Sequence, residues 1–502
     1  MSTQRLQDQL KIENQMMETF NSGHYTIEDP MIVMNPYNLN PLSAYILFKT
    51  HKETAISVNV KGKSKVADMK QTFPKRKVHV LPIYGLHLND KTDVEISFYQ
   101  GKTVTHTLET SGIEFDENIV INFEADPIVL ENKLLVYATP TTFFEYHLPF
   151  ALDSLGNIRW LITEPFNWDF RQLENGRIMV GTGEKIVHPY YVSGLYEIDW
   201  MVKIHVFYEI DTLYHHDFIE IGDNELLVLT DQKDDSTTED ALVVFNRETG
   251  EVTKRWRYQD FIDPTKTRRS GSWSEFDWAH NNAVWYDEHT NSLTLSFRHM
   301  DTILNVNYDT QELNWILSDP KGWDQEYIDK YFLKPEGYNF EYTYGQHAVS
   351  FNDIGEMLVF DNHYRGKKHP DYIKAKHGYS RGVRFKINPE ERTIETVWQY
   401  GKDLGAKVYS PYISFVKYYS DDHNLVHFGG TAYEDGQISE YHGPSGHERG
   451  VEMVSHTFEI SYGKQLLSAH LKGNYYRVRK IPYKLENYCF EPKLAKHVHV
   501  TD

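Results

Sequence analysis

The chain has 502 residues, of which 40% are hydrophobic and 14% aromatic, a composition typical of a folded globular protein. Lysine and arginine number 52 against 72 for aspartate and glutamate, and the net charge of −20 argues against nucleic acid or an anionic membrane as a partner. The one cysteine, Cys489, excludes a disulfide within the chain. No apolar run approaches the roughly 18 residues of a membrane span, and the N-terminus lacks the pattern of a secretory signal. We therefore expect a cytoplasmic protein, or a periplasmic or secreted one if a signal has been removed.

The first 128 residues are predicted to form a helix and a small β-domain. Residues 1–24 carry apolar side chains at roughly helical spacing, among them Leu6, Leu10, Met16 and Phe20, and predict one amphipathic helix. Short alternating stretches follow from residue 25 to 128, including "AISVNVKGK", "DVEISFYQGK" and "IVINFEA". These stretches predict an N-terminal antiparallel β-sandwich without clustered chemistry.

A repeat occupies residues 129–502 and indicates the main architecture. Six copies share a strand, an Asp/Asn/Gly turn and a second strand with an aromatic residue, from "FFEYHLPFALDSLGNIRWLI" through "ALVVFNRETGEVTKRWRY" to "HTFEISYGKQLLSAHL". A second hairpin, such as "ENGRIMVGTG" or "HTNSLTLSFR", precedes most copies. Two hairpins make a four-stranded blade, so the pattern predicts an all-β fold with a six-bladed β-propeller. A pair of sandwiches would not explain the sixfold recurrence.

Histidines recur at the start of the first strand in three of the predicted blades. They are His215 and His216 in "YHHDFIEI", His280 in "DWAHNNAV" and His347 in "GQHAVSF". The first strand of each blade lines the central axis of a propeller, so these side chains are expected to meet there. A lone histidine at a strand end is usually a turn residue, but recurrence in three blades favours a functional centre.

Folding each hairpin about its turn predicts the residue opposite each histidine. Arg298 lies opposite His280, Asp361 opposite His347, and Asp231 opposite His216. A slip of one residue in any of these registers would move the side chain to the other face of the sheet.

The predicted centre combines imidazoles with a guanidinium, and this combination decides between kinds of chemistry. Several histidines can bind a metal, but a permanent positive charge beside them opposes a cation. Arginine and imidazole donors together suit a tetrahedral oxyanion, and a histidine can also act as a nucleophile. The residues therefore predict sulfuryl or phosphoryl transfer with no metal and no other cofactor.

The motifs "HHD", "DWAHNNAV" with "SFRH", and "GQHAV" with "FDN" resemble those of the bacterial arylsulfate sulfotransferases, which need no phosphoadenosyl cofactor. The resemblance covers nearly the whole chain. It implies that small aryl sulfates and phenols are the substrates, that a sulfohistidine forms in a ping-pong reaction, and that the protein is a homodimer.

The resemblance also implies a role for each residue of the motifs. His347 would be the sulfated nucleophile, His280 and Arg298 would hold the sulfuryl oxygens, and Asn282 would add a hydrogen bond. The "HHD" histidine would complete the cradle or protonate the leaving phenol; the turn spacing favours His216, whereas aligning "HHD" with "HNN" favours His215. The substrate-binding candidates are Asn282, Asp361 and Tyr344; Tyr344 lies with Tyr342 and Tyr364 near the predicted nucleophile.

The chain also departs from well-known members of that family, since it has neither a signal nor a second cysteine. Two other functional classes stay open at this stage. One is a metal-dependent, histidine-rich propeller oxygenase or lyase, and the other is a non-catalytic propeller that binds an anion or a partner protein. A hydrolase, in which water replaces the phenol acceptor, is a variant of the leading hypothesis.

Overall fold

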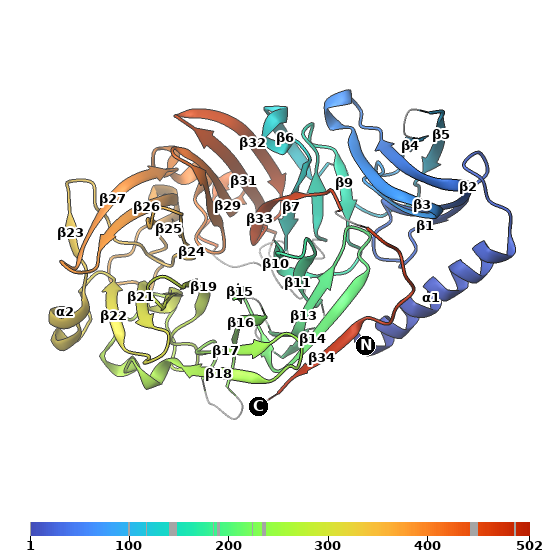
Figure 1. Ribbon diagram of the computed structural model, residues 1–502. Helices are drawn as coiled ribbons and strands as arrows, with labels where there is room; N and C mark the ends of the chain where they lie inside the picture. The colour runs from blue at the N-terminus through green and yellow to red at the C-terminus, as the bar shows by residue number, and fades with distance from the viewer. Residues whose placement is uncertain are drawn as a thin grey trace.

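The computed structural model describes residues 2–98, 101–116, 118–139, 148–183, 185–187, 191–222, 224–232, 237–441, 450–485 and 488–501. Nearly all of the regular structure is β, and this confirms the predicted all-β class. A small N-terminal domain precedes six sheets that surround a common centre (Figure 1). Residues 143–147, where the first predicted repeat begins, lie outside the described residues.

The N-terminal helix α1 (Ser2–Ser22) forms where the apolar spacing predicts it. Its buried face carries Leu6, Met16 and Phe20. Gln9 exchanges hydrogen bonds of 2.8 Å with the backbone N–H and carbonyl of Ile204, and Glu13 pairs with Lys203 at 2.6 Å. The helix therefore packs on its own chain. Within the described part of the chain, no helix has both the length and the apolar character needed to cross a membrane.

The N-terminal β-domain is one antiparallel sheet, and its two longest strands pair with each other along most of their length. Its strands are β1 (Met31–Met34), β2 (Ser43–Val60), β3 (Met69–Tyr84), β4 (Lys91–Phe98) and β5 (Thr103–Glu109). The first half of β2 pairs with β1 and its second half with β4, while β3 pairs along both halves.

One boundary of this domain was predicted wrongly. The stretch "IVINFEA" contains β6 (Val120–Ala125), which pairs with the distant strand β32 of a central sheet, Ala125 opposite Leu467. Alternation of apolar residues identifies a strand, but it carries no information about which sheet accepts that strand.

The strands after the N-terminal domain form six sheets in the described residues, and the first strand of each sheet is the innermost. The first sheet has β10 (Asn167–Gln172), β11 (Ile178–Gly181), β13 (Tyr191–Ile198), β14 (Ile204–Tyr214) and β34 (Lys496–Val500), with β12 (Lys185–Val187) beside β13. The second has β15 (Phe218–Ile221), β16 (Glu225–Thr230), β17 (Ala241–Asn246) and β18 (Val252–Arg257). The third has β19 (Asn281–Asp287), β20 (Ser292–Phe297), β21 (Thr302–Asn307) and β22 (Leu313–Leu317).

The other three sheets follow the same order. The fourth has β24 (His347–Phe351), β25 (Met357–Asp361), β26 (Arg381–Asn388), β27 (Thr393–Tyr400) and β23 (Lys334–Glu336), and helix α2 (Gln325–Tyr331) precedes β23 in the chain. The fifth has β28 (Phe415–Ser420), β29 (His423–Glu434), β31 (Glu452–Ser461), β32 (Lys464–Lys472) and β6, with β30 (Gln437–Ile438) beside β29. The sixth has β33 (Arg477–Pro482), β7 (Lys133–Ala138), β8 (Phe150–Leu152) and β9 (Ile158–Leu161).

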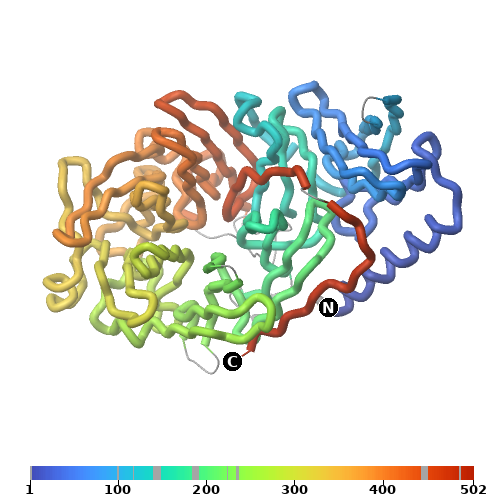
Figure 2. Tube along the Cα trace, viewed as in Figure 1, coloured from blue at the N-terminus to red at the C-terminus, as the bar shows by residue number. Residues whose placement is uncertain are grey.

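Strands from opposite ends of the chain close the ring of sheets. The innermost strand of the sixth sheet is β33, which pairs with β7 so that Arg477 lies opposite Ala138. Figure 2 shows the tube passing around the ring of sheets until a red segment, which contains β33, lies near the cyan segment that contains β7. Because of this closure, Tyr476 and Arg477 reach the centre from the C-terminal part of the chain.

Both faces of the central sheets are buried, because neighbouring sheets pack face to face. Leu358 and Phe360 of the fourth sheet share a core with Val416 and Val426 of the fifth. Strands β16 and β17 are buried at nearly every position. This two-sided burial explains why the inner strands read as continuous apolar runs in the sequence and do not alternate cleanly.

Candidate active site

The residues that begin the innermost strands meet at the centre of the ring. The His216 ring lies 4.3 Å from the Trp168 ring and 5.1 Å from the His280 ring, measured between centroids. Tyr476 connects the other side of this group, with its ring centroid 5.0 Å from Trp168 and 6.4 Å from His347. The structure thus brings together His216, His280 and His347, which lie on three different sheets.

His347 has one ring nitrogen fixed by two carbonyl oxygens. Its Nδ1 lies 2.7 Å from Asn362 Oδ1 and 3.1 Å from the backbone oxygen of Gly345. Carbonyl oxygens only accept hydrogen bonds, so Nδ1 carries the proton and Nε2 carries the lone pair. Nε2 makes no hydrogen bond to any residue in the described ranges, and it is therefore the atom presented to a ligand.

The orientation of Asn362 is itself fixed by hydrogen bonds. Its Nδ2 donates to the backbone oxygens of Ser410 and Ile413, both at 2.8 Å. With the amide nitrogen occupied there, the amide oxygen must face His347. Three backbone segments thus determine which nitrogen of His347 is protonated.

The predicted partner of His347 was wrong by one residue. Phe360, and not Asp361, lies opposite His347, whereas Ser350 and Phe351 pair in the predicted register. The register shifts between His347 and Ser350, where Ala348 has a positive φ of 58°. This bulge changes which residues meet across the two strands.

His347 is buried, with 3% of its surface exposed, and its electrostatic surroundings keep it neutral. Burial lowers the pKa of His347 well below the usual value of 6.5, and the nearby positive charge of Arg298 lowers it further. A neutral imidazole with its lone pair on Nε2 is the form that can act as a nucleophile.

His280 lies in the opposite electrostatic environment. Its Nδ1 lies 2.6 Å from a carboxylate oxygen of Glu239 and 2.9 Å from one of Asp277. Burial alone would lower the pKa of His280, but the two carboxylates outweigh it and raise the pKa to about 9. His280 is therefore an imidazolium at neutral pH, and its Nε2–H makes no hydrogen bond to another described residue.

Arg298 lies beside His280, as the hairpin predicts. The backbone N–H of Arg298 donates to the backbone oxygen of His280 at 3.2 Å. The guanidinium contacts His299 Nε2 through Nη1 at 3.1 Å, and it lies 5.6 Å from the centroid of the Tyr364 ring. Its Nε is buried without a hydrogen-bond partner, and no carboxylate of the described residues lies within 4.0 Å of the group. A buried guanidinium without a counterion is suited to bind an anion.

Of the two neighbouring histidines, His216 faces the centre. His215 Nε2 lies 3.1 Å from the backbone oxygen of Thr230, and the Nδ1 atoms of His215 and His216 are 2.8 Å apart. Since Thr230 can only accept, His215 donates through Nε2 and accepts at Nδ1 from His216. The predicted partner Asp231 is wrong, because Asp217 pairs with Leu229 and the chain turns at His216, whose φ is 55°.

The three predicted substrate-binding residues occupy different surroundings. Asn282 is buried, and its Nδ2 donates to the backbone oxygen of Gln346 at 2.8 Å, directly before His347. Asp361 accepts from the backbone of Tyr344 and His363 and pairs with Arg381 at 3.0 Å. Neither Asp361 nor Tyr344 has a hydrogen bond or ion pair with His347. Both instead support the loop that precedes strand β24, which begins at His347.

An open pocket adjoins the guanidinium of Arg298 through the ring of Tyr364. Its volume is about 440 Å³, and it is lined by Tyr364, Tyr409 and Tyr441 together with Lys367 and Lys368. Glu440 also lines it, and its carboxylate accepts hydrogen bonds from Tyr372 and Ala375. Aromatic walls with cationic groups suit a planar ring that carries a negative charge.

Comparisons with known proteins identify the family of the chain. The sequence profile of the family described as arylsulfotransferase matches residues 121–477, and the profile of the arylsulfotransferase Ig-like domain matches residues 31–111. The chain belongs to the arylsulfotransferase family. As a member of that family, the protein is an enzyme, an arylsulfate sulfotransferase.

Two curated relatives and one solved structure illustrate the extent of the similarity. Arylsulfate sulfotransferase AssT of Lelliottia amnigena is 23% identical over 81% of this chain and 86% of its own length. The protein of the same name from Escherichia coli O6:H1 is 33% identical over 31% of this chain and 28% of its own. The β-propeller domain of Cps50 from Myceliophteria thermophila aligns with a TM-score of 0.31 and 9% identity, over 67% of this chain and 87% of that domain.

Two groups of side chains in this arylsulfotransferase have donor sets that a metal ion accepts. They are His215, His216 and Glu239, and Asp277, His280 and His299. Several of the histidine donor atoms are already engaged, however, as in the contacts from His216 to His215 and from His280 to Asp277. A metal would have to break these bonds next to the positive charge of Arg298, so the donor sets fit a closed hydrogen-bond network better than a metal site.

Several functional residues were missed in the sequence, although signals for some were present. Asn362 is the last letter of "FDN", Asp277 the first of "DWAH", and His299 the last of "SFRH", so three of them lie inside the motifs that were recognised. Glu239 precedes a strand of another sheet and has no sequence signal, because its proximity to His280 is created only by tertiary packing.

Proposed function

We propose that the protein transfers a sulfuryl group from an aryl sulfate to a phenol through a sulfohistidine at His347. The observation that carries the proposal is the pairing of a neutral His347, with its lone pair on Nε2, with two cationic groups. These are the unpaired guanidinium of Arg298 and the imidazolium of His280. Neither cation would be useful beside a metal, whereas both stabilise the negative charge on sulfuryl oxygens.

In the first half-reaction, His347 Nε2 attacks the sulfur of the donor. The N–S bond forms as the bond from sulfur to the aryl oxygen breaks, and the phenolate leaves with that electron pair. The His347 ring becomes positive while Nδ1 keeps its proton. The hydrogen bonds from Nδ1 to Asn362 and Gly345 therefore strengthen in the transition state, when the ring gains charge.

His280 is well suited to supply a proton to the departing phenolate. Its pKa of about 9 is close to the value of about 10 for a phenolic hydroxyl, so a proton moves between the two groups with little driving force either way. The neutral, deeply buried His216 has its Nδ1 proton directed at His215, and this favours a supporting role for it in the cradle.

In the second half-reaction, the acceptor phenol replaces the first phenol. Its oxygen attacks the sulfur, the N–S bond breaks, and its proton returns to the neutral His280. The aromatic pocket beside Tyr364 supports an aryl acceptor over water, because a ring can stack there while its oxygen approaches Arg298.

A two-part experiment tests the proposal. Release of nitrophenolate from 4-nitrophenyl sulfate is followed at varied donor and phenol concentrations, and a ping-pong reaction gives parallel double-reciprocal lines. The enzyme is then incubated with donor alone, and mass spectrometry without acid should find the sulfuryl group on the peptide that contains His347. A turnover independent of phenol would indicate hydrolysis, and accumulation of sulfoenzyme in His347→Asn would refute the assignment of the nucleophile.

A further inference from the structure

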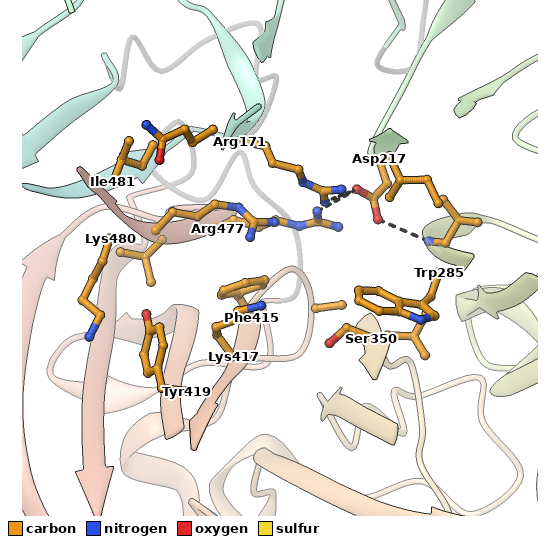
Figure 3. Close-up of a pocket in the computed structure, with 17 residues that line it drawn as sticks. Arg171, Asp217, Trp285, Ser350, Phe415, Lys417, Tyr419, Arg477, Lys480 and Ile481 are labelled. Carbon is orange, nitrogen blue, oxygen red and sulfur yellow. Dashed lines mark hydrogen bonds and ion pairs between the residues drawn. The ribbon is translucent and has the colours of Figure 1, made fainter. Parts of the chain in front are cut away.

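A second cavity lies along the axis of the ring, beyond the histidines. All six innermost strands contribute to it, and its volume is about 340 Å³. The histidines lie at the first residues of these strands, whereas the cavity is lined by positions further along them, such as Lys417 in β28 and Arg479 in β33. We call it the axial cavity; Figure 3 shows it with its lining residues.

The axial cavity is rich in cationic side chains, although the whole chain carries a net charge of −20. The basic residues that line it are Arg171, Lys417, Arg477, Arg479 and Lys480. They come from three strands, β10, β28 and β33. In Figure 3, Arg171 and Arg477 extend toward Asp217 from one side of the cavity, and Phe415 and Trp285 lie across from them.

Three carboxylates compensate only part of this charge. Asp169 pairs with Arg477 at 2.9 Å and with Arg479 at 2.6 Å. Asp217 pairs with Arg171 and Arg477, both at 2.9 Å. Glu459 pairs with Lys480 at 2.7 Å. Five cationic groups therefore face three carboxylates, and two positive charges remain uncompensated by the described residues.

Lys417 is the basic residue of the cavity with no ion pair to a described residue. Lys417 lines the axial cavity, and the residue keeps part of its surface exposed. Burial lowers the pKa of Lys417 to about 8, and the positive charges of Arg479 and Arg171 act in the same direction. The cations are thus crowded enough to repel one another, and an anion among them would relieve this repulsion.

We infer that the axial cavity is a second anion site, which binds a small tetrahedral oxyanion of the sulfate or phosphate class. Arg479 holds Asp169 through Nε and Nη2, whereas its Nη1 makes no hydrogen bond to a described residue and can donate to such an ion. The ammonium group of Lys417 adds a point charge. The volume exceeds the roughly 30 Å³ share of one water many times, so the ion would enter with part of its hydration shell.

The axial cavity is distinct from the proposed sulfuryl site, but its lining residues are neighbours in the chain of residues at that site. Arg477 follows Tyr476, whose ring adjoins His347, and Asp217 follows His216. Asp217 also accepts a hydrogen bond from the backbone of Val284 at 3.2 Å, two residues after Asn282. The inference does not depend on the proposed reaction, since it concerns binding by other residues.

Calorimetric titration with sodium sulfate and with sodium phosphate, at constant ionic strength kept by chloride, tests the inference. The wild type is expected to bind a tetrahedral anion at a site that survives Arg298→Gln. Lys417→Gln should weaken that site at least roughly tenfold, because it removes a charged hydrogen bond. Lys464→Gln is the matched control, since Lys464 is exposed at a distant hairpin, and it should leave the affinity unchanged. The relative affinities for sulfate and phosphate identify the preferred ion.

A crystal soaked in selenate gives an independent readout of position. The expected result is an anomalous peak between Lys417 and the arginines of β33. The inference would be overturned by an anomalous peak beside Arg298 alone. It would also be overturned by equal affinity in the wild type and Lys417→Gln, or by no binding of either anion. The melting temperature of Lys417→Gln is measured first, and it should equal or exceed that of the wild type, because Lys417 makes no ion pair to break and its replacement removes repulsion from Arg171 and Arg479.

Discussion

Replacement of Asn362 by leucine tests the idea that a fixed tautomer makes His347 a nucleophile. Leucine has a similar volume but cannot accept the Nδ1 proton, which now donates at 2.7 Å to Asn362 Oδ1. Loss of one neutral hydrogen bond weakens the tautomer preference by about 1 kcal/mol. In the wild type this hydrogen bond strengthens as the His347 ring becomes positive, and losing that gain adds about 1–2 kcal/mol to the barrier for sulfation.

Together these effects slow sulfation of His347 by about 30- to 150-fold. The loss should be smaller than the roughly 10⁴-fold loss that follows when the tautomer of a catalytic histidine is wrong. The reason is that the backbone oxygen of Gly345 remains as a second acceptor at 3.1 Å. The assay is the burst of nitrophenolate in a single turnover, and the KM for the donor should change little because Arg298 and His280 are intact.

Asn40→Leu is the matched control for the structural cost of this change. Asn40 is a buried asparagine outside the site, with hydrogen bonds of 3.0 Å to the backbone of Trp200 and Leu42. Both leucine variants should lose thermal stability, but only Asn362→Leu should lose the burst. In Asn362→Asp the negative charge raises the pKa of His347, so the acidic limb of the rate profile should move to higher pH. An unchanged burst rate in a folded Asn362→Leu, or an equal loss in Asn40→Leu, would refute the reasoning.

Four further outcomes follow from the same geometry. Arg298→Lys keeps the charge but loses the fork, so kcat/KM for the aryl sulfate should fall about 10²-fold; a change below threefold would contradict oxyanion binding by the guanidinium. Activity should decline as pH rises through about 9, where His280 loses its proton, and Glu239→Gln should shift this limb to lower pH. The pKa of His280 is raised above its unfolded value, so the stabilising contribution of protonated His280 is complete below about pH 6.5 and is lost as pH rises through about 9. The melting temperature of Glu239→Gln should therefore fall less across that pH range than the melting temperature of the wild type. Tyr364→Leu should raise the KM for the phenol about 2- to 10-fold with little change in the burst amplitude. An unchanged KM would show that the aromatic pocket does not bind the acceptor.

The sequence by itself determined the class of fold and the enzyme family. Alternating strands and turn residues repeat along the chain, and sequence distance within a hairpin is short, so local patterns fix the strands and bring His280 beside Arg298. The residue types at the strand starts already argued against a simple metal centre, because a guanidinium does not lose its charge.

Only the tertiary structure decided the details on which reactivity depends. A bulge of one residue at Ala348 separates Asp361 from His347 and leaves Asn362 to bind the imidazole. Strands β6 and β33 reach sheets that lie hundreds of residues away in the chain, and Glu239 meets His280 across two sheets. The physical reason is the same in each case: hydrophobic periodicity specifies which face of a strand is buried, but hydrogen-bond register and the packing of sheets select the partners.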